Sequence, residues 1–341
     1  MNGNCKDRNL RKQKRRRTLL VILGLILIWS MINLFITLIF SGMIPHRYAS
    51  AREGRDMMLS NTEYYDGLTQ NDIEFRMRKS GATKEELYEA SRESVSDFFF
   101  FEKWYINSRL ARMALHLKLK GYKLPEVEKI VFIKADMEME SGASGYTHGT
   151  QIYLSDDMVT IYALMNIIPG FSEFMDKLLY HEFFHCLTRS NPQFRADMYS
   201  LIHFTITDTE YELPTCVLER YISNPDVEHH NSYATFLIDG QEIDCYTAWI
   251  TTKSYAEAQS GFMSNDATVL VPVDGTDIYY TREEASNFDE VFGTNTGYVT
   301  DPEECMADNF AYAMLYGMKG NDGNGYPNPE IIRGIIDYLK R

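Results

Sequence analysis

The chain has 341 residues and a formal net charge of −14, from 48 acidic and 34 basic side chains. This length allows one large domain, or a core domain with a subdomain. The acidic balance argues against a nucleic acid or an anionic lipid surface as the partner. Basic residues nevertheless gather at the N-terminus: residues 1–18 carry eight of them against Asp7, a net charge of +7, which leaves −21 for residues 19–341.

Residues 19–40 form an apolar run of 22 residues without a charged side chain. A helix of this length measures about 33 Å, which is enough to cross the hydrocarbon core of a bilayer. The apolar core of a cleaved signal peptide is shorter, about 7–15 residues, so we predict an uncleaved signal-anchor. The basic flank, residues 1–18, is expected to stay cytoplasmic and to leave the rest of the chain outside the cytoplasm. The sequence thus predicts a single-pass membrane protein, with no nucleic acid as a partner.

Residues 41–95 are polar and carry mixed charges, and they predict a partly helical stalk that follows the membrane span. Within them, Thr83 and Glu86 have the spacing of a capping box, which indicates the start of a helix. Residues 98–119 then carry apolar and aromatic side chains at helical spacing, as is typical of a core helix. We expect residues 96–341 to form the main folded domain.

Two strands are predicted next, one from the alternation in residues 127–135 and one in residues 151–155. A helix near 158–167 follows, and then a longer helix at about 172–188. The order of strands and helices predicts a mixed α+β domain.

The longer helix contains the most informative stretch of the chain, His181-Glu182-Phe183-Phe184-His185. Residues four apart lie on one helix face about one turn apart, so both imidazoles can bind one Zn²⁺. The adjacent Glu182 is placed to take a proton from a water molecule that the metal activates. The competing interpretation is a helix that carries two histidines by chance.

A β-rich insertion is predicted at about 204–285, between this helix and the C-terminal helices. Residues 232–252 contain an Asp-Gly turn signal typical of a hairpin, and residues 267–273 predict a further strand. Cys216 and Cys245 flank the predicted hairpin and could form a disulfide outside the cytoplasm, but their connectivity does not follow from the sequence.

A catalytic zinc site has three protein ligands and an open position, so a third ligand must come from another segment. The metzincin pattern is excluded, because it needs Gly at position 188 and His at position 191, where this chain has Thr and Asn. A later predicted helix offers Glu304 and Asp308, four apart on its buried face. We predict Glu304 as the third ligand and Asp308 as the carboxylate that orients a ligating histidine. Glu303 faces about 100° away and is the weaker ligand candidate.

The H-E-x-x-H motif, followed on a later helix by Glu304-Cys305-Met306-Ala307-Asp308-Asn309-Phe310, resembles the gluzincin group of zinc metallopeptidases. The later helix is similar to the metal helix of the lethal-factor-like peptidases. The resemblance implies that His181, His185 and Glu304 bind one Zn²⁺ and that Glu182 is the general base. It also implies that residues 149–155 form an edge strand that pairs with an extended peptide substrate.

The resemblance extends to an oxyanion donor, because a tyrosine shortly before the third ligand often has this role in the family. Tyr298 is the matching residue. His229 and His230 are an alternative oxyanion donor or a further metal contact, although a histidine pair in a polar loop is more often solvated. The chain departs from the family in one respect: His185 and Glu304 are 119 positions apart, which leaves the form of the substrate groove open.

These features together predict a zincin-like α+β metallopeptidase that is anchored in the membrane and cleaves a peptide or protein substrate outside the cytoplasm, with one Zn²⁺ as its cofactor. An intramembrane protease is excluded, because the apolar run around His181 is too short to span a bilayer. Two alternatives stay open. One is a non-catalytic cell-surface binding or regulatory protein with a zinc-stabilised zincin fold, and the other is an adhesion or assembly module without a metal.

Overall fold

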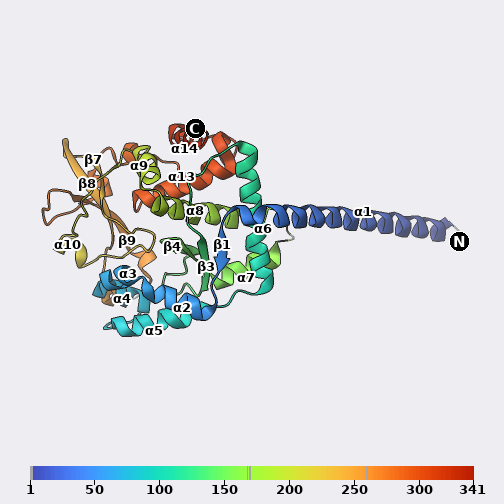
Figure 1. Ribbon diagram of the computed structural model, residues 1–341, viewed down its shortest axis with the longest axis horizontal. Coiled ribbons are helices and arrows are strands. Elements are labelled where there is room, and N and C mark those ends of the chain that lie inside the picture. Colours follow the sequence, from blue (N-terminus) through green and yellow to red (C-terminus); the bar gives the residue numbers. More distant parts are fainter. Residues whose placement is uncertain (1–2, 167, 169, 259) are drawn as a thin grey trace. The chain divides into compact units, whose positions relative to one another are not determined.

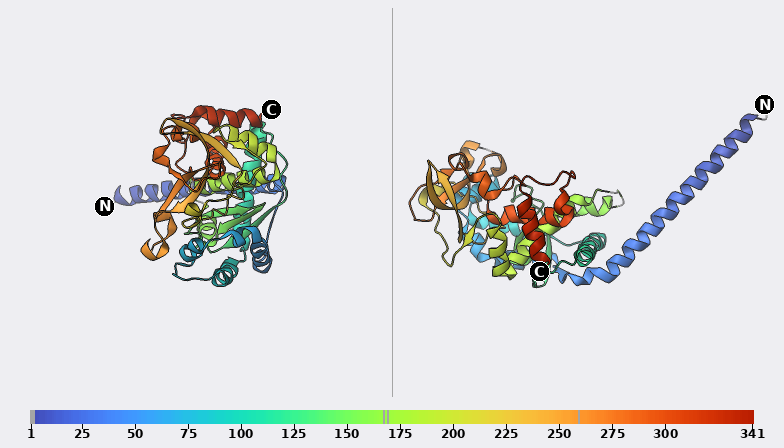
Figure 2. Two further views of the ribbon diagram at one scale, coloured as in Figure 1. Left: turned by 90° about the vertical axis from the view of Figure 1, so that its left-hand side faces the viewer. Right: turned by 90° about the horizontal axis from the view of Figure 1, so that it is seen from above.

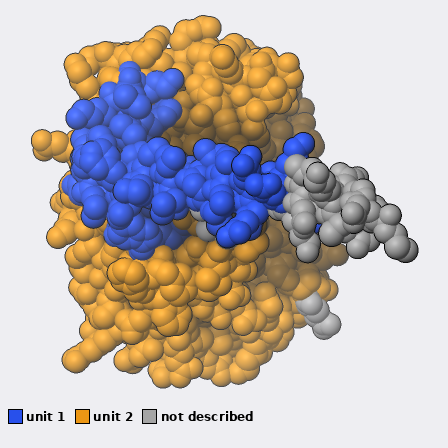
Figure 3. All heavy atoms as spheres, turned by 90° about the vertical axis from the view of Figure 1, so that its right-hand side faces the viewer, with its two compact units in different colours: residues 1–44, 104–120 blue, residues 45–103, 121–341 orange. Residues whose placement is uncertain are grey.

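The fold is mixed α+β, as expected from the sequence. The structure is a computed structural model that describes residues 3–166, 168, 170–258 and 260–341. The described residues form two compact units, coloured separately in Figure 3. The first unit runs from the N-terminus to Ile44 and includes Trp104–Lys120, and the second comprises Pro45–Lys103 and Gly121–Arg341.

The first unit contains the continuous helix α1, Gly3–Phe40 (Figure 2). The stretch Gln13–Met43, which runs from α1 through the short 3-10 helix Ser41–Met43, is long and apolar enough to cross a membrane, and the predicted span lies inside it. Thr37 is buried, and Asn33 accepts a hydrogen bond from Arg112 on helix α6, Phe100–Lys120. The last turns of α1 therefore pack against protein on one face.

The first sheet of the second unit has the strand order β1-β3-β5-β4. Strands β1, β3 and β5 run parallel, β4 runs antiparallel to β5, and β2 pairs antiparallel with β3. The strands are His46–Tyr48 (β1), Val95–Ser96 (β2), Ile130–Ala135 (β3), Gly145–His148 (β4) and Gln151–Ser155 (β5). The expectation that residues 149–155 form the edge strand was wrong, because β5 lies between β3 and β4. One edge of the sheet is β4.

The prediction that residues 41–95 form a stalk was also wrong, because most of them belong to the folded domain. Strand β1 belongs to the first sheet, and helices α2 to α5 lie against that sheet (Figure 1). Met58, Leu68 and Leu87 are buried together with Val131 and Ile133 of β3. The apolar residues of these helices are spread over short elements, so no single window shows a strong period. The helices are Ala51–Ser60 (α2), Thr62–Gly67 (α3), Gln70–Met77 (α4) and Lys84–Ser94 (α5).

Helices α7, α8, α9, α13 and α14 complete this part of the unit. Figure 1 shows α8 and α13 on the side of the first sheet opposite to α2–α5. Helix α13 begins where the sequence predicted: Asp301 is the N-cap and accepts a hydrogen bond from the backbone N–H of Glu303, with Pro302 in the first turn. The helices are Asp156–Met165 (α7), Glu173–Ser190 (α8), Pro192–Ser200 (α9), Pro302–Tyr316 (α13) and Pro329–Leu339 (α14).

The second sheet corresponds to the β-rich insertion and has the order β10-β9-β8-β7-β6, all antiparallel. Strands β7 and β8 form the predicted hairpin, and both turn residues, Asp239 and Gly240, have a positive φ, as a tight hairpin turn requires. The strands are Thr205–Ile206 (β6), Ser232–Ile238 (β7), Gln241–Thr251 (β8), Asp266–Pro272 (β9) and Tyr280–Thr281 (β10). The short helices Thr215–Leu218 (α10), Tyr255–Ala258 (α11) and Phe288–Phe292 (α12) lie in or beside this region.

The disulfide considered between Cys216 and Cys245 is not formed. Both cysteines are free, and Cys245 is buried in β8. Cys216 lies on α10 and donates its backbone N–H to Asp277.

Candidate metal centre

The three predicted ligands come together where α8 packs against α13. His181 and His185 lie one turn apart on α8, and Glu304 lies in the first turn of α13. One ligand atom from each residue lies within 4.8 Å of the others, and all three side chains are buried.

The distances within this group suit a shared ion. Oε2 of Glu304 lies 2.9 Å from Nε2 of His181 and 3.7 Å from Nε2 of His185. In a tetrahedral zinc site with bonds of about 2.0–2.1 Å, two ligand atoms are roughly 3.3 Å apart. The two observed separations lie on either side of this value.

A carboxylate behind His181 fixes the direction of its ring. Nδ1 of His181 is 3.1 Å from Oδ1 of Asp308, which leaves Nε2 to face Glu304. Asp308 is in turn held by Lys177 at 3.0 Å and by the Thr296 hydroxyl at 2.6 Å. Burial opposes the charge of this imidazole, but the hydrogen bonds to Asp308 and Glu304 raise the pKa of His181 well above its ordinary value in the metal-free protein.

The equivalent carboxylate behind His185 is Glu303, a role that the sequence reasoning missed. Nδ1 of His185 is 2.9 Å from Oε1 of Glu303. Glu303 also accepts hydrogen bonds from the hydroxyls of Thr188 at 2.5 Å and Tyr199 at 2.6 Å. Despite burial, the contact with His185 and the nearby Arg189 lower the pKa of Glu303 to about 2. Two adjacent glutamates at the start of a predicted buried helix were the sequence signal for this role. Glu303 contacts His185, and Glu304 contacts His181.

Glu182 lies beside the ligands with its carboxylate held from β4. Its Oε2 accepts a hydrogen bond of 2.8 Å from the Thr147 hydroxyl. A Cβ at Gly145 would come within 2.9 Å of the Tyr153 carbonyl and 3.3 Å of Oε1 of Glu182, so glycine lets the strand pass close to this carboxylate. Burial raises the pKa of Glu182, which suits a group that accepts a proton near neutral pH.

Tyr298 lies at the centre, but its hydroxyl is directed at a ligand. It donates a 3.0 Å hydrogen bond to Oε1 of Glu304, and its ring stacks on His181 at 6.0 Å. Asn224 donates to the same Oε1 at 2.6 Å. These two contacts fix the orientation of the Glu304 carboxylate and leave its Oε2 to face the histidines.

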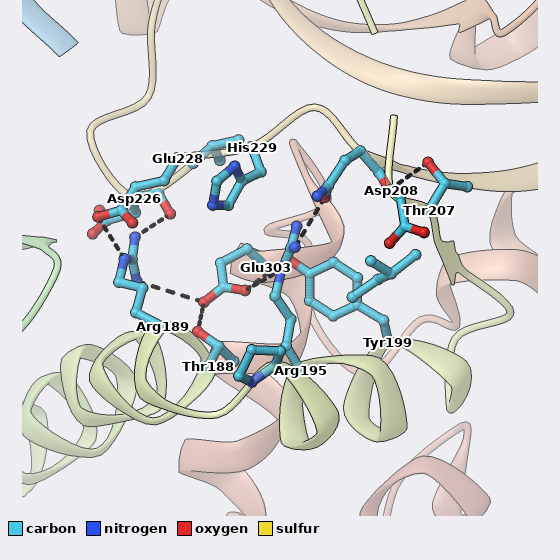
Figure 4. Close-up of a pocket in the computed structure, with 14 residues that line it drawn as sticks. Thr188, Arg189, Arg195, Tyr199, Thr207, Asp208, Asp226, Glu228, His229 and Glu303 are labelled. Atoms are coloured by element: carbon cyan, nitrogen blue, oxygen red, sulfur yellow. Dashed lines mark hydrogen bonds and ion pairs between the residues drawn. The ribbon is translucent and has the colours of Figure 1, made fainter. Parts of the chain in front are cut away.

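His229 and His230 do not face the ligands. His229 is exposed and pairs with Glu210 at 2.6 Å, and its ring lines a neighbouring pocket (Figure 4). Nε2 of His230 is 2.9 Å from the Tyr221 hydroxyl, and the ring packs near Tyr246. Both histidines have partners of their own, so the structure gives no support to the expected oxyanion or metal contact.

A further carboxylate, Asp226, reaches the centre from the loop before β7. Its Oδ1 lies 3.9 Å from Nε2 of His185, and it groups with Glu182 and His185 as a second set of possible ligands within 4.8 Å. Burial and the charges of Glu182 and Glu304 raise the pKa of Asp226 well above its ordinary value. The sequence carried no spacing signal for this residue, because it lies in an irregular loop far along the chain from both helices.

The residues present fit a divalent cation. Nε2 of His185 is buried and has no hydrogen-bond partner among the described residues. The nearest carboxylate oxygens are those of Glu304 at 3.7 Å and Asp226 at 3.9 Å. A buried nitrogen in this state is costly unless a ligand satisfies it. Two imidazole nitrogens and a carboxylate oxygen, each oriented by further hydrogen bonds, are a ligand set typical of zinc.

No protein-family model, curated protein or solved structure matches this chain. The chemistry of the centre therefore has to be inferred from its own residues.

Proposed function

We propose that this chain is a membrane-anchored zinc metallopeptidase with a zincin-like catalytic domain. One observation carries the proposal: two histidines and a glutamate converge from α8 and α13, each imidazole has a carboxylate on its far nitrogen, and the carboxylate of Glu182 lies alongside. A purely structural zinc site has no need of Glu182.

Zn²⁺, when bound by His181, His185 and Glu304, would supply Lewis-acid activation of water and of the substrate carbonyl. Glu182 would accept the proton of the attacking water and later donate it to the leaving amine. The Thr147 hydroxyl keeps the Glu182 carboxylate directed at the site. The hydroxyl of Tyr298 donates to Glu304 at 3.0 Å and would stabilise the oxyanion only after it leaves that hydrogen bond.

The substrate backbone would pair with β4, the edge of the first sheet. Edge strands present unpaired N–H and C=O groups to an extended peptide, and β4 also carries the threonine that contacts Glu182. This assignment moves the predicted substrate strand from residues 149–155 to Gly145–His148.

The apolar stretch of α1 supports an anchored protein, and the basic residues before it support a cytoplasmic N-terminus. The catalytic domain would then lie outside the cytoplasm.

A second candidate function is a non-catalytic zinc-stabilised protein. The observation that favours it is Asp226, which approaches the position where a catalytic site needs to be open. The two functions differ in what they require of Glu182.

The test is cleavage of a proteome-derived peptide library by the full chain in detergent, with Glu182→Gln as the matched variant. We expect the parent to cleave and Glu182→Gln to lose at least about a hundredfold in rate while it retains zinc. Equal cleavage by both would contradict the proposed mechanism.

A further inference from the structure

The loop Ser223–Glu228, here called the closing loop, lies over the candidate metal centre. It is irregular in structure, yet Ser223, Asn224 and Asp226 are buried. Irregular segments usually run over the surface, because their backbone groups need partners. A loop that carries a carboxylate into a buried ligand cluster therefore needs an explanation.

The first contact of the closing loop is with the ligands. Asn224 donates to Oε1 of Glu304, and the Asn224 side-chain oxygen accepts the backbone N–H of Asp226 at 2.9 Å. This arrangement turns the Asp226 carboxylate toward Nε2 of His185, the buried nitrogen without a hydrogen-bond partner. Asp226 thus lies beside one of the proposed ligands, His185, with which it and Glu182 form the second group of possible ligands.

The second contact is with the substrate strand. Oδ1 of Asp226 accepts the backbone N–H of Thr147 at 2.6 Å, and Oε1 of Glu228 accepts that of Gly149 at 2.6 Å. The carbonyl of Thr147 faces Arg189 at 3.5 Å. Backbone groups at the outer edge of β4 and its turn are therefore already paired, and an extended peptide cannot pair with them until the loop leaves.

Arg189 holds the closing loop in this position. It donates to the Asp226 carbonyl at 2.6 Å and pairs with Glu228 at 2.8 Å. Figure 4 shows Arg189 between Asp226, Glu228 and Glu303 at one side of a pocket of about 360 Å³. At the other end of the loop, Ser223 is fixed by hydrogen bonds to Asp72 of α4. The pocket borders Asp226, Val227 and Glu228, so this part of the loop has open space on one side, whereas Ser223 is held in place.

We propose that Asp226 is a removable fourth ligand of the metal, and that the closing loop keeps the centre in a latent state. Departure of Asp226 and Glu228 opens the fourth metal position and frees the β4 amides in one movement. This inference rests on the proposed peptidase function and adds its regulation.

The experiment uses the full chain in detergent, loaded with zinc, as the parent, Asp226→Ala and the isosteric Asp226→Asn. The matched control is Asp208→Asn, the same chemical change at an exposed residue of the same pocket. Three quantities are measured: the rate at which a chelator removes zinc, hydrogen exchange of the segment 145–150, and cleavage of the peptide library. Glu182→Gln in the Asp226→Ala background tests whether any cleavage gained is catalytic.

We expect Asp226→Ala to lose zinc about tenfold faster or more, to exchange the Thr147 and Gly149 amides faster, and to gain at least about tenfold in Glu182-dependent cleavage. Asp226→Asn keeps the shape of the side chain and should show the same direction, and Asp208→Asn should match the parent.

Each other outcome overturns part of the account in a distinct way. Unchanged zinc release in both Asp226 variants would show that Asp226 is not a ligand. Parent cleavage as fast as that of Asp226→Ala would reject latency and leave the peptidase standing. Faster zinc release and exchange without cleavage in any variant would reject both latency and the peptidase.

Discussion

Two regions of the molecule reach the same centre by different means. Helices α8 and α13 present His181, His185 and Glu304 at positions set by the helical repeat and by the packing of the two helices against each other. The closing loop brings Asp226 there without regular structure, through hydrogen bonds of Asp226 with Thr147 and of Asn224 with Glu304, both distant in the sequence. The helices therefore provide the fixed ligands of the proposed site, and the closing loop provides a ligand, Asp226, that we propose can leave.

The largest expected effect on zinc binding and stability comes from removing one of the ligands on the helices. His185→Ala should abolish zinc binding, and with it the stability that zinc adds, about 4 kcal/mol when zinc is present at a thousandfold its dissociation constant. Thermal unfolding with and without zinc measures this. His229→Ala is the control, because His229 pairs with Glu210 at the surface and should keep the zinc effect. A zinc-dependent shift in His185→Ala equal to that of the parent would contradict the assignment.

A smaller effect is expected from Glu303, which orients His185 without touching the ion. Glu303→Gln should weaken zinc binding about 10- to 100-fold, or roughly 1.4–2.8 kcal/mol, because the imidazole loses its charged partner. Competition with a chelator measures the affinity. Glu290→Gln, an exposed residue of α12, should leave the affinity unchanged. If both substitutions had the same effect, Glu303 would have no positioning role.

The end of β4 next to the closing loop should show a pH dependence. Burial lowers the pKa of His148 from 6.5 to about 3. As the pH falls from about 6.5 toward 3, the unfolded chain takes up a proton that the folded chain does not, so this histidine reduces stability by at most about 1.4 kcal/mol per pH unit. Urea unfolding between pH 7 and 5, in excess chelator, measures the slope. His148→Gln should flatten it, and an unchanged slope would contradict the assignment of the shift to His148.

The smallest effect is expected at the cysteines of the β-rich region. Cys216 and Cys245 are free, so a reducing agent should change the free energy of unfolding by less than about 0.5 kcal/mol. A native disulfide would lower it by about 2–5 kcal/mol on reduction. Thiol labelling of the denatured, unreduced protein should modify both residues, and protection of the pair would show a disulfide.

The sequence predicted the elements that have a local signature. Periodicity and capping residues located α8, the start of α13 and the hairpin β7–β8, because each depends on residues near one another in the chain. The pairing of His181 and His185 could be expected, because helical spacing decides which side chains share a face. Glu304 could be expected only from the motif on the later helix.

What the sequence did not predict depends on contacts between distant segments. The packing of helices α2–α5 does not follow from their own sequence, because their apolar residues pack against Val131 and Ile133 of β3, which lie further along the chain. The edge position of β4 depends on strand order, which periodicity does not contain. Asp226 and Glu303 acquire their roles only when the loop and the helix start are brought to His185.

The most direct test of the central claim is the metal content of the full chain purified in detergent, measured by elemental analysis for the parent, Glu182→Gln and Glu304→Ala. We predict about one equivalent of zinc in the parent and in Glu182→Gln, and almost none in Glu304→Ala, because Glu304 is a ligand and Glu182 is not. A parent without metal, or a Glu304→Ala variant that keeps a full equivalent, would contradict the account.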